Sequence, residues 1–331
     1  MRSTSRSARV PALLGAAALV TAALAGCTAL PGFGGCTPAY HDGDTSSTVT
    51  ATGDVGSKPD VDFPTPLIAK TPEVSVLTRG DGAQIGQNGQ VDYAISWFDG
   101  STGALQQAVG YGEPGSDDTP ARSAVGLSAY AISQALTCTR VGDRIALTAT
   151  YSEAFPPDDP SKQDDTTMVY VIDVLASYAD RATGFNQLPQ DGLPVVVTAP
   201  DGTPAIALGT VERPTTTRIE TVKGGSGATV REDSRVVAHL RLWGWPGDTG
   251  GEPAELASTW GKSQQAVTLT LEDSAKNIIP PGIVRALTGA KVGSQLLVVI
   301  PPGDDGYQTP PQGVGADTTM IWVVDILGIQ K

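Results

Sequence analysis

The residue types that most often carry enzyme chemistry are few and scattered in this chain. Its two histidines, His41 and His239, lie far apart, and neither has a cysteine or carboxylate at the spacing of a metal-ligand set. A zinc site needs several such side chains together, and a Ser-His-Asp centre needs a histidine held between two partners. We therefore expect no metal site and no hydrolytic triad, and we expect His239 to face solvent beside Leu240.

Two further motifs have both a functional and a structural interpretation. Asp158, Asp159, Asp164 and Asp165 could hold calcium, but they lack the alternating spacing and the central glycine of a calcium loop, which favours a solvated loop. The glycine-rich stretch at 224–227 could cradle a phosphate, but we expect a strand after it rather than a helix. The sequence therefore predicts no cofactor.

One of the three cysteines lies where lipid chemistry is expected. Residues 1–9 contain three arginines and no acid, an apolar stretch follows from Val10 to Leu24, and Leu24-Ala25-Gly26-Cys27 closes it. This is the pattern of a signal peptide, and small residues before a cysteine suit transfer of lipid to the thiol of Cys27 and cleavage ahead of it. An ordinary transmembrane anchor is the alternative, but the apolar run is short for a membrane span.

The other two cysteines, Cys36 and Cys138, remain as a pair if Cys27 carries lipid. The expected location is the outer face of the cytoplasmic membrane, where conditions are oxidising, so we predict that they form a disulfide. Two unpaired thiols are the alternative. Such a bridge would close a loop of about 100 residues and join the N-terminal tether to the first folded part of the chain.

The charge of the chain narrows the choice of partners. Lysine and arginine number 22 against 35 acidic residues, which gives a net charge of −13. Nucleic acid is an unfavourable partner for such a chain, and anionic lipid headgroups would repel it. We therefore expect contact with the membrane only through the lipid anchor, while the composition predicts no oligomeric state.

An internal repeat decides the domain organisation. Matching segments occur twice in the same order and at similar spacing, namely 80–83 and 225–228, 140–147 and 291–298, and 165–175 and 317–327. We predict a signal peptide at 1–26, a flexible tether at 27–49 and two copies of one domain at 50–180 and 190–331. The segment 184–193 leads from the first copy into the second.

The hydrophobic pattern within each copy indicates mainly strands. Apolar residues alternate at Val91, Tyr93, Ile95 and Trp97, and again at 238–242 and 267–271, which is typical of half-buried strands. Two segments, 129–136 and 283–287, show the spacing of a short helix on a sheet. Extended pieces at 61–67 and 194–198 open the copies, and we expect each to add an edge strand, where proline is tolerated.

This order of elements resembles the FKBP family of peptidyl-prolyl cis-trans isomerases over nearly all of both copies. The most specific stretches are 279–293, with Ile-Pro-Pro-Gly-Ile and later Lys-Val-Gly, then Ile-Pro-Pro at 300–302, Tyr307, and 319–327. The resemblance implies an α+β fold of two tandem FKBP-like domains, each an antiparallel sheet wrapped around one short helix. It also implies a tandem-domain bacterial, actinobacterial-like lipoprotein.

The resemblance also implies a site in each copy. In the second copy it places the catalytic pocket at Tyr307, Trp322, Ile279 and Pro280, and its apolar wall at Leu240, Leu256, Val267 and Ile283. In the first copy the corresponding substrate-binding positions are Tyr93, Leu105, Ile132, Phe155 and Tyr170. Tyr93 is matched to a strand tyrosine of the family, for which the second copy has Leu240.

Both copies depart from the family pattern. The acidic residue that follows the first pocket phenylalanine becomes Gln106 in one copy and Ala257 in the other. The resemblance therefore predicts an extracytoplasmic prolyl isomerase of weak activity that acts on proline-containing segments of exported proteins. A non-catalytic peptide-binding or chaperone-like lipoprotein on the same scaffold is the alternative. A solute-binding lipoprotein fits less well, because the sequence lacks the alternation of strands and helices that two α/β lobes require.

Overall fold

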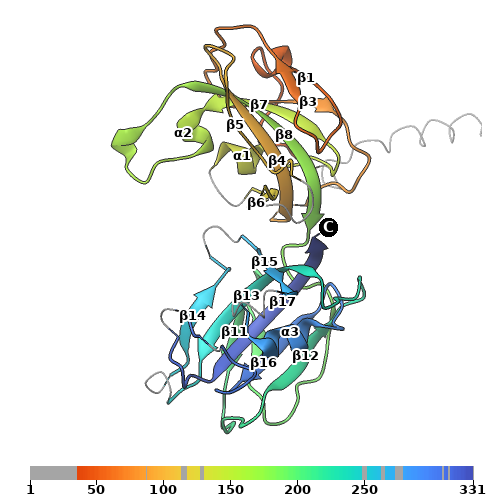
Figure 1. The fold of residues 1–331 in the computed structure, drawn as a ribbon, viewed down its shortest axis with the longest axis vertical. Coiled ribbons are helices and arrows are strands. Elements are labelled where there is room, and N and C mark those ends of the chain that lie inside the picture. The colour runs from red at the N-terminus through yellow and green to blue at the C-terminus, as the bar shows by residue number, and fades with distance from the viewer. Residues whose placement is uncertain are drawn as a thin grey trace, which may run out of the picture. The chain divides into compact units, whose positions relative to one another are not determined.

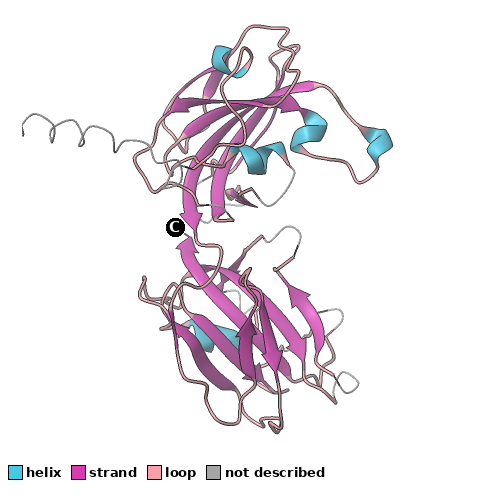
Figure 2. Cartoon of the chain, turned by 180° about the vertical axis from the view of Figure 1, so that it is seen from behind, coloured by secondary structure: helices cyan, strands magenta, loops and turns pink. Residues whose placement is uncertain are grey.

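The protein forms two antiparallel β-sheets of six and seven strands with few short helices (Figures 1 and 2). The computed structural model describes residues 36–86, 88–112, 118–126, 130–247, 252–261, 265–272, 279–307, 309–311 and 314–330. The predicted signal peptide and Cys27 lie outside the described residues. In the part of the chain that is described, no helix has both the length and the apolar character needed to cross a bilayer.

The first sheet has the strand order β3-β7-β8-β4-β5, and β6 also pairs with β4. Two α-helices and two 3-10 helices accompany it, α1 (Ala131–Ala135), α2 (Tyr151–Ala154), η1 (Ser46–Thr48) and η2 (Pro160–Lys162). Its strands are β3 (Glu73–Thr78), β4 (Gln90–Asp99), β5 (Leu105–Val109), β6 (Ala121–Ala124), β7 (Arg144–Thr150) and β8 (Thr167–Tyr178).

The second sheet repeats this topology, with the order β14-β13-β17-β16-β12-β9 and β15 also paired with β13. Its one described α-helix is α3 (Pro281–Leu287), and its strands are β9 (Phe185–Asn186), β12 (Arg218–Gly224), β13 (Arg235–Gly244), β14 (Ala254–Ser258), β15 (Val267–Thr270), β16 (Gln295–Ile300) and β17 (Met320–Gln330). Only β9 has no counterpart in the first sheet. The two-copy fold class expected from the sequence is therefore confirmed.

The register of the strands repeats as closely as their order. The pairing shifts by a bulge at Asp92/Tyr93 and at Val237/Ala238, and the bulge at Val76/Thr78 has its equivalent at Thr221/Lys223. A further shift at Trp97/Phe98 is matched by one at Leu242/Trp243. Bulges bend and twist a sheet at defined positions, so both sheets curve around their helices in the same way.

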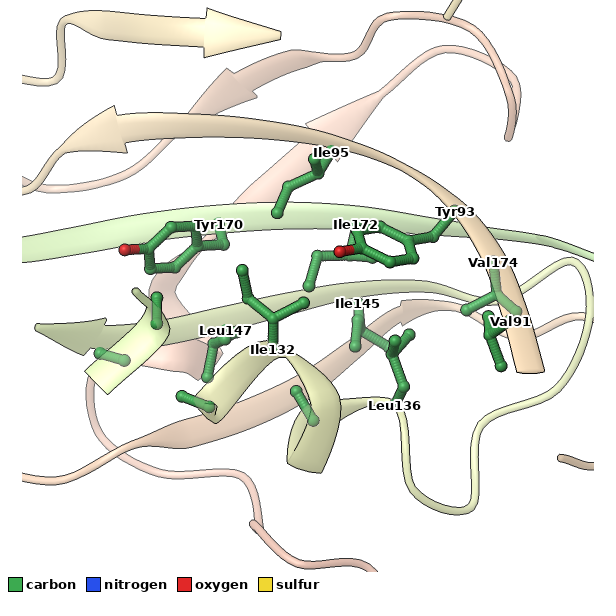
Figure 3. Packing of buried hydrophobic residues seen from close by; sticks show 14 of the residues in the cluster. Val91, Tyr93, Ile95, Ile132, Leu136, Ile145, Leu147, Tyr170, Ile172 and Val174 are labelled. Atoms are coloured by element: carbon green, nitrogen blue, oxygen red, sulfur yellow. The ribbon is translucent and has the colours of Figure 1, made fainter. Parts of the chain in front are cut away.

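Each sheet packs its inner face against a short helix. In the first copy Ile132 and Leu136 of the α1 region lie against Tyr93, Tyr170 and other strand residues, as Figure 3 shows. The second copy buries Ile283 and Leu287 of α3 in the same way. Period-two alternation places one set of side chains on this face. The predicted helices are thus present, although α1 begins at Ala131 and Ala129 lies outside the described residues.

The outer face of each sheet is also apolar and is covered by a separate two-stranded hairpin. The hairpin β1 (Thr50–Thr52) with β2 (Asp60–Asp62) belongs to the first copy, and β10 (Val195–Thr198) with β11 (Pro204–Ala207) to the second. The prediction of edge strands at 61–67 and 194–198 is therefore wrong. Outer-face side chains such as Phe98 and Trp243 are buried by segments around these hairpins, because a sheet with two apolar faces needs cover on both sides.

A fully buried ion pair holds the first hairpin region in place. The Arg144 guanidinium donates to the Asp173 carboxylate at 2.6 Å, and neither side chain is exposed. Arg144 also donates to the backbone carbonyls of Gly53 and Asp54 at 2.8 and 2.9 Å, while Asp173 accepts the Gly56 backbone N–H at 2.7 Å. The pair therefore ties the loop between β1 and β2 to the two central strands.

The second copy has a corresponding clamp, in which an uncharged glutamine replaces the arginine. Asp325 accepts the Gln295 side-chain amide at 2.7 Å and the Ala182 backbone N–H at 2.8 Å. Gln295 and Asp325 face each other across β16 and β17 as Arg144 and Asp173 do across β7 and β8. Burial raises the pKa of Asp325, in spite of these two donors and of the positive charges of Lys223 and Arg181, which all lower it.

The segment between the copies belongs to the second sheet rather than forming a free linker. Gly184 donates its backbone N–H to Gly293 at 2.8 Å, and Gln187 donates to Val222 at 2.8 Å. Leu193 is buried in the outer cluster of the second copy. The domain boundaries expected from the sequence stay a prediction, but residues 184–193 contribute contacts to the second fold.

Cys36 and Cys138 are both disulfide-bonded. Cys138 has a φ of 68°, and Gly289 occupies the corresponding turn of the second copy with a φ of 86°. The left-handed region is unfavourable for a side chain other than glycine. The backbone of the first copy is therefore locally strained at Cys138.

We expect Asp173→Asn to lower the free energy of unfolding of the first copy by about 3 to 5 kcal/mol, because it leaves the buried Arg144 charge without its partner. Urea unfolding followed by circular dichroism measures the change. The control is Asp180→Asn, which removes the surface pair with Arg181 and should cost about 1 kcal/mol or less. Equal losses of stability in the two variants would contradict the proposed role of the Arg144–Asp173 pair.

Candidate functional site

The second copy gathers most of its predicted site residues into one apolar cluster. Leu240, Ile279, Ile283 and Trp322 are buried there, and Leu256, Val267 and Tyr307 pack against it while remaining partly exposed. The strands β13 and β17 supply Leu240 and Trp322, and α3 supplies Ile283. Inner-face alternation along β17 explains why Trp322 faces the helix. Aliphatic side chains thus surround the indole ring of Trp322 in this cluster.

Pro280 forms the N-terminal boundary of α3 and is itself buried. Its carbonyl accepts the Ile283 backbone N–H at 2.9 Å, which fixes the first turn of the helix. Pro281 follows as the first residue of the helix, where proline is suitable because its φ is already close to the helical value and its missing N–H is not needed. Ile279 and Pro280 therefore stand together where the chain enters the helix beside the cluster.

Tyr307 lies in the loop between β16 and β17 and covers Trp322. The two ring centroids are 6.5 Å apart, with an angle of 48° between the ring planes. Burial raises the pKa of Tyr307, so its hydroxyl stays protonated at neutral pH. Among the described residues, none forms a hydrogen bond with this hydroxyl. The Tyr307 hydroxyl is therefore free to bind a ligand.

Asp305 holds this loop against α3. Its carboxylate accepts two hydrogen bonds from the Arg285 guanidinium at 2.7 Å and one from the Thr217 hydroxyl at 2.6 Å, and its backbone carbonyl accepts the Gly282 N–H at 2.9 Å. Burial alone would raise the pKa of Asp305, but Thr217 and Arg285 outweigh it and lower the pKa. The clamp positions Tyr307, two residues further along the chain.

The first copy forms a more aromatic version of the site. Tyr93, Ile132 and Tyr170 are buried in the inner core, in one layer of side chains (Figure 3). Phe155 lies above them with 37% of its surface exposed, and its ring centroid is 6.2 Å from that of Tyr170. Burial raises the pKa of Tyr93 to about 12. Phe155 therefore covers Tyr170 as Tyr307 covers Trp322.

Two aromatic residues of this site were not predicted. The rings of Trp97 and Tyr151 lie 5.7 and 5.3 Å from that of Phe155. Trp97 is the last residue of the alternating run in β4, so its inward direction could have been read from the pattern. Tyr151 follows Thr150, whose capping box with Glu153 begins α2. That Thr-x-x-Glu motif was the available signal for a helix at this loop.

The strand register corrects one match between the copies and one predicted pocket position. Tyr93 pairs with Val174, and Ile326, the equivalent of Val174, pairs with Ala238, so Tyr93 corresponds to Ala238. Leu240 lies two residues further along β13 and corresponds to Ile95. Leu105 lies on β5 with 40% of its surface exposed and is not part of the inner core. The match of Tyr93 with Leu240 failed because residues two apart on a strand lie on the same face, so alternation alone does not fix which of them correspond.

The remaining candidate groups have structural explanations. His239 is buried, with its ring 4.5 Å from that of Trp260, and burial lowers its pKa to about 4. The expectation that His239 faces solvent is therefore wrong. Trp243 and Trp245 are buried in the outer cluster, where they contribute to packing. Within the described ranges, no group of acidic, histidine or cysteine side chains could hold a metal ion.

The comparisons with known proteins concern the fold. No protein-family model matches the sequence, and no curated protein matches it significantly. The solved structures that it resembles include the three FKBP domains of wheat FKBP73, with 14% identity, a TM-score of 0.29 and coverage of 78% of this chain and 95% of that one. FkpA from Escherichia coli shows 19% identity, a TM-score of 0.28 and coverage of 43% of this chain.

This chain spans about half of FkpA, 53% of its length. A peptidyl-prolyl cis-trans isomerase from Pseudomonas syringae pv. tomato DC3000 shows 19% identity and a TM-score of 0.25, with 33% of this chain and 77% of that one covered.

We expect Arg285→Ala to loosen the loop that carries Tyr307 while lowering global stability by about 1 kcal/mol or less, since the pair is partly exposed. Faster amide hydrogen exchange at Gly282 measures the loosening. Folding lowers the pKa of Asp305. The stabilisation that its carboxylate provides is therefore fully present above the pKa of the unfolded state, and it is lost as the pH falls through the pKa of the folded state. Exchange at Gly282 that is the same in parent and variant at neutral pH would contradict the clamp.

Proposed function

We propose that the protein binds proline-containing peptide segments and slowly catalyses the cis-trans isomerisation of the prolyl bond. The observation that carries this proposal is the same in both copies: a partly exposed loop aromatic covers a buried aromatic above the helix, as Tyr307 covers Trp322. Such an arrangement can enclose a proline ring and exclude water. The chemistry requires no metal, nucleophile or general base.

The physical basis of the catalysis is the resonance of the prolyl amide. Its rotational barrier is about 20 kcal/mol because the planar amide is charge-separated, and rotation removes that resonance. An apolar surrounding disfavours the planar form relative to the twisted one, so enclosure by Leu240, Ile283 and Trp322 acts on the transition state. The Tyr307 hydroxyl can donate a hydrogen bond to a carbonyl of the peptide.

Turnover should lie mainly in the second copy, because its loop aromatic carries a hydroxyl and the corresponding Phe155 does not. The sequence matches the acidic position of the family to Gln106 and Ala257, whereas the strand register makes Ala257 the equivalent of Gln107, and none of these three residues is acidic. Neither copy therefore offers a carboxylate beside the cluster at that position. We expect weak activity for this reason.

Binding without turnover is the second candidate function, and it is favoured by the first copy. Tyr151 and Phe155 are in contact, with ring centroids 5.3 Å apart, and expose 39% and 37% of their surfaces. Exposed apolar side chains that lie together often mark a contact surface for peptide or protein. The first copy would then capture extended segments, and the second would isomerise them.

The proposed setting is the outer face of the cytoplasmic membrane, with the protein held by a lipid on Cys27. The support is the signal sequence and the cysteine that follows it. The oxidised state of Cys36 and Cys138 fits an extracytoplasmic location. Clients would be exported proteins that fold after translocation.

We expect the full chain to accelerate isomerisation of a blocked Ala-Pro tetrapeptide in a protease-coupled assay, and Trp322→Ala to lower kcat/KM at least tenfold. Each 1.4 kcal/mol of lost transition-state stabilisation is about tenfold in rate. Tyr170→Ala in the first copy is the matched control and should have the smaller effect.

Both variants must still unfold cooperatively, so that lost packing is not mistaken for lost catalysis. A parent protein with no acceleration that still binds the tetrapeptide would favour the binding function. A parent protein that neither binds nor isomerises would refute both.

A fractionation experiment tests the anchor. Cys27→Ser should move the protein from the membrane fraction to the soluble fraction and abolish incorporation of labelled fatty acid, since the thiol is the proposed acceptor of lipid. Cys138→Ser is the control for loss of a cysteine in general and should retain the label. Unchanged label in Cys27→Ser would rule out the lipoprotein assignment.

A further inference from the structure

One position of the final strand carries a buried polar group in both copies. Tyr170 pairs across the sheet with Trp97 and Leu147. Trp322 pairs with Leu242 and Val298 at the equivalent places. Tyr170 is fully buried, and Trp322 is 5% exposed. The two residues are therefore structural equivalents on the inner face, in front of the helix.

The polar atoms of these two side chains have no hydrogen-bond partner among the described residues. They are the Tyr170 hydroxyl oxygen and the Trp322 indole nitrogen, and both are buried. Buried donors are nearly always paired, because an unpaired one loses its hydrogen bond to water on folding. The chain has thus placed an unpaired donor at the same point twice, although the two side chains differ.

Each of the two buried rings packs against the aromatic residue of the neighbouring loop. The centroid distances are 6.2 Å from Phe155 to Tyr170 and 6.5 Å from Tyr307 to Trp322. Both loop aromatics are partly exposed, so each lies between solvent and a buried ring.

We propose that the Tyr170 hydroxyl and the Trp322 indole N–H each donate a hydrogen bond to a carbonyl oxygen of the bound peptide, and that Trp322 selects for prolyl amides. This inference rests on the proposed function. An X–Pro amide has a carbonyl acceptor but no N–H. The indole of Trp322 offers only a donor, so it satisfies such an amide and leaves the N–H of an ordinary amide unpaired, whereas the Tyr170 hydroxyl can also accept a hydrogen bond.

The protonation state of Tyr170 agrees with this role. Burial, with smaller contributions from Tyr151 and Asp164, raises the pKa of Tyr170 well above its usual range. The hydroxyl is therefore a donor throughout the physiological range. An indole N–H is a donor at any pH and cannot accept a hydrogen bond.

The first experiment uses Tyr170→Phe, which removes one oxygen atom and preserves the ring. Binding of a blocked Ala-Pro tetrapeptide is measured on the full chain, in a background with Trp322→Ala so that the first copy is observed. We expect about tenfold weaker binding, equivalent to 1.4 kcal/mol. The melting temperature should be unchanged or higher, because an unpaired buried group has been removed. A residue that only packs would give no loss of affinity.

The second experiment observes the indole N–H directly. In the full chain labelled with nitrogen-15 on tryptophan, the Trp322 resonance should shift downfield on addition of the tetrapeptide, and its exchange with solvent should slow. Trp322→Phe assigns the signal and should weaken binding about tenfold in a Tyr170→Ala background. Trp260→Phe is the matched control, because its indole nitrogen is also buried without a partner but lies beside His239.

A third measurement tests the selection for prolyl amides. The tetrapeptide with alanine in place of proline should bind the parent at least tenfold more weakly, and this preference should shrink in Trp322→Phe.

Unchanged affinity in both phenylalanine variants, together with an unmoved Trp322 signal, would overturn the donor role and leave the proposed function standing. A parent protein that binds no prolyl peptide would overturn the proposed function, and the donor role with it.

Discussion

A buried carboxylate on the last long strand of each copy is the constraint on which the fold depends. Asp173 and Asp325 lie in the middle of their sheets, and each reaches both a neighbouring strand and the segment that enters the copy. This contact keeps the entering segment over the outer face, where the apolar side chains need cover. In the first copy Arg144 balances the charge. In the second copy Gln295 supplies a hydrogen bond but no charge, so burial raises the pKa of Asp325.

Much of the fold could be predicted from the sequence, because repeat, alternation and helical spacing are local signals. The outer hairpins could not be predicted in the same way. The alternation in 194–198 indicates a strand, but it does not identify the partner, and a strand can pair with a sheet edge or with its neighbour along the chain. The decisive fact is that Leu297 and Val299 are buried on the outer face, which makes a covering layer necessary. The need for this covering layer arises only in the assembled sheet, so a local sequence pattern does not reveal it.

The candidate site was predicted in part, and the errors have identifiable causes. Buried positions such as Ile132, Ile283 and Trp322 follow from the inner-face alternation, so their grouping in the cores agrees with the expectation. The match of Tyr93 with Leu240 failed because residues two apart on a strand lie on the same face, so an apolar alternation does not fix which of them correspond. Tyr151 was missed because its contact with Phe155 depends on the shape of a loop helix.

The site and the core share one layer of side chains, and this limits how the two copies can diverge. Tyr170 and Trp322 are both core residues and both lie beneath a loop aromatic, so a change at either position alters packing as well as binding. Aromatic replacements that nearly conserve volume are the ones a core tolerates. The two copies differ at this position in the kind of donor and in ring size, while aromatic character is kept. An unpaired buried donor lowers stability, so its presence in both copies at one register position is more easily explained by a ligand than by packing.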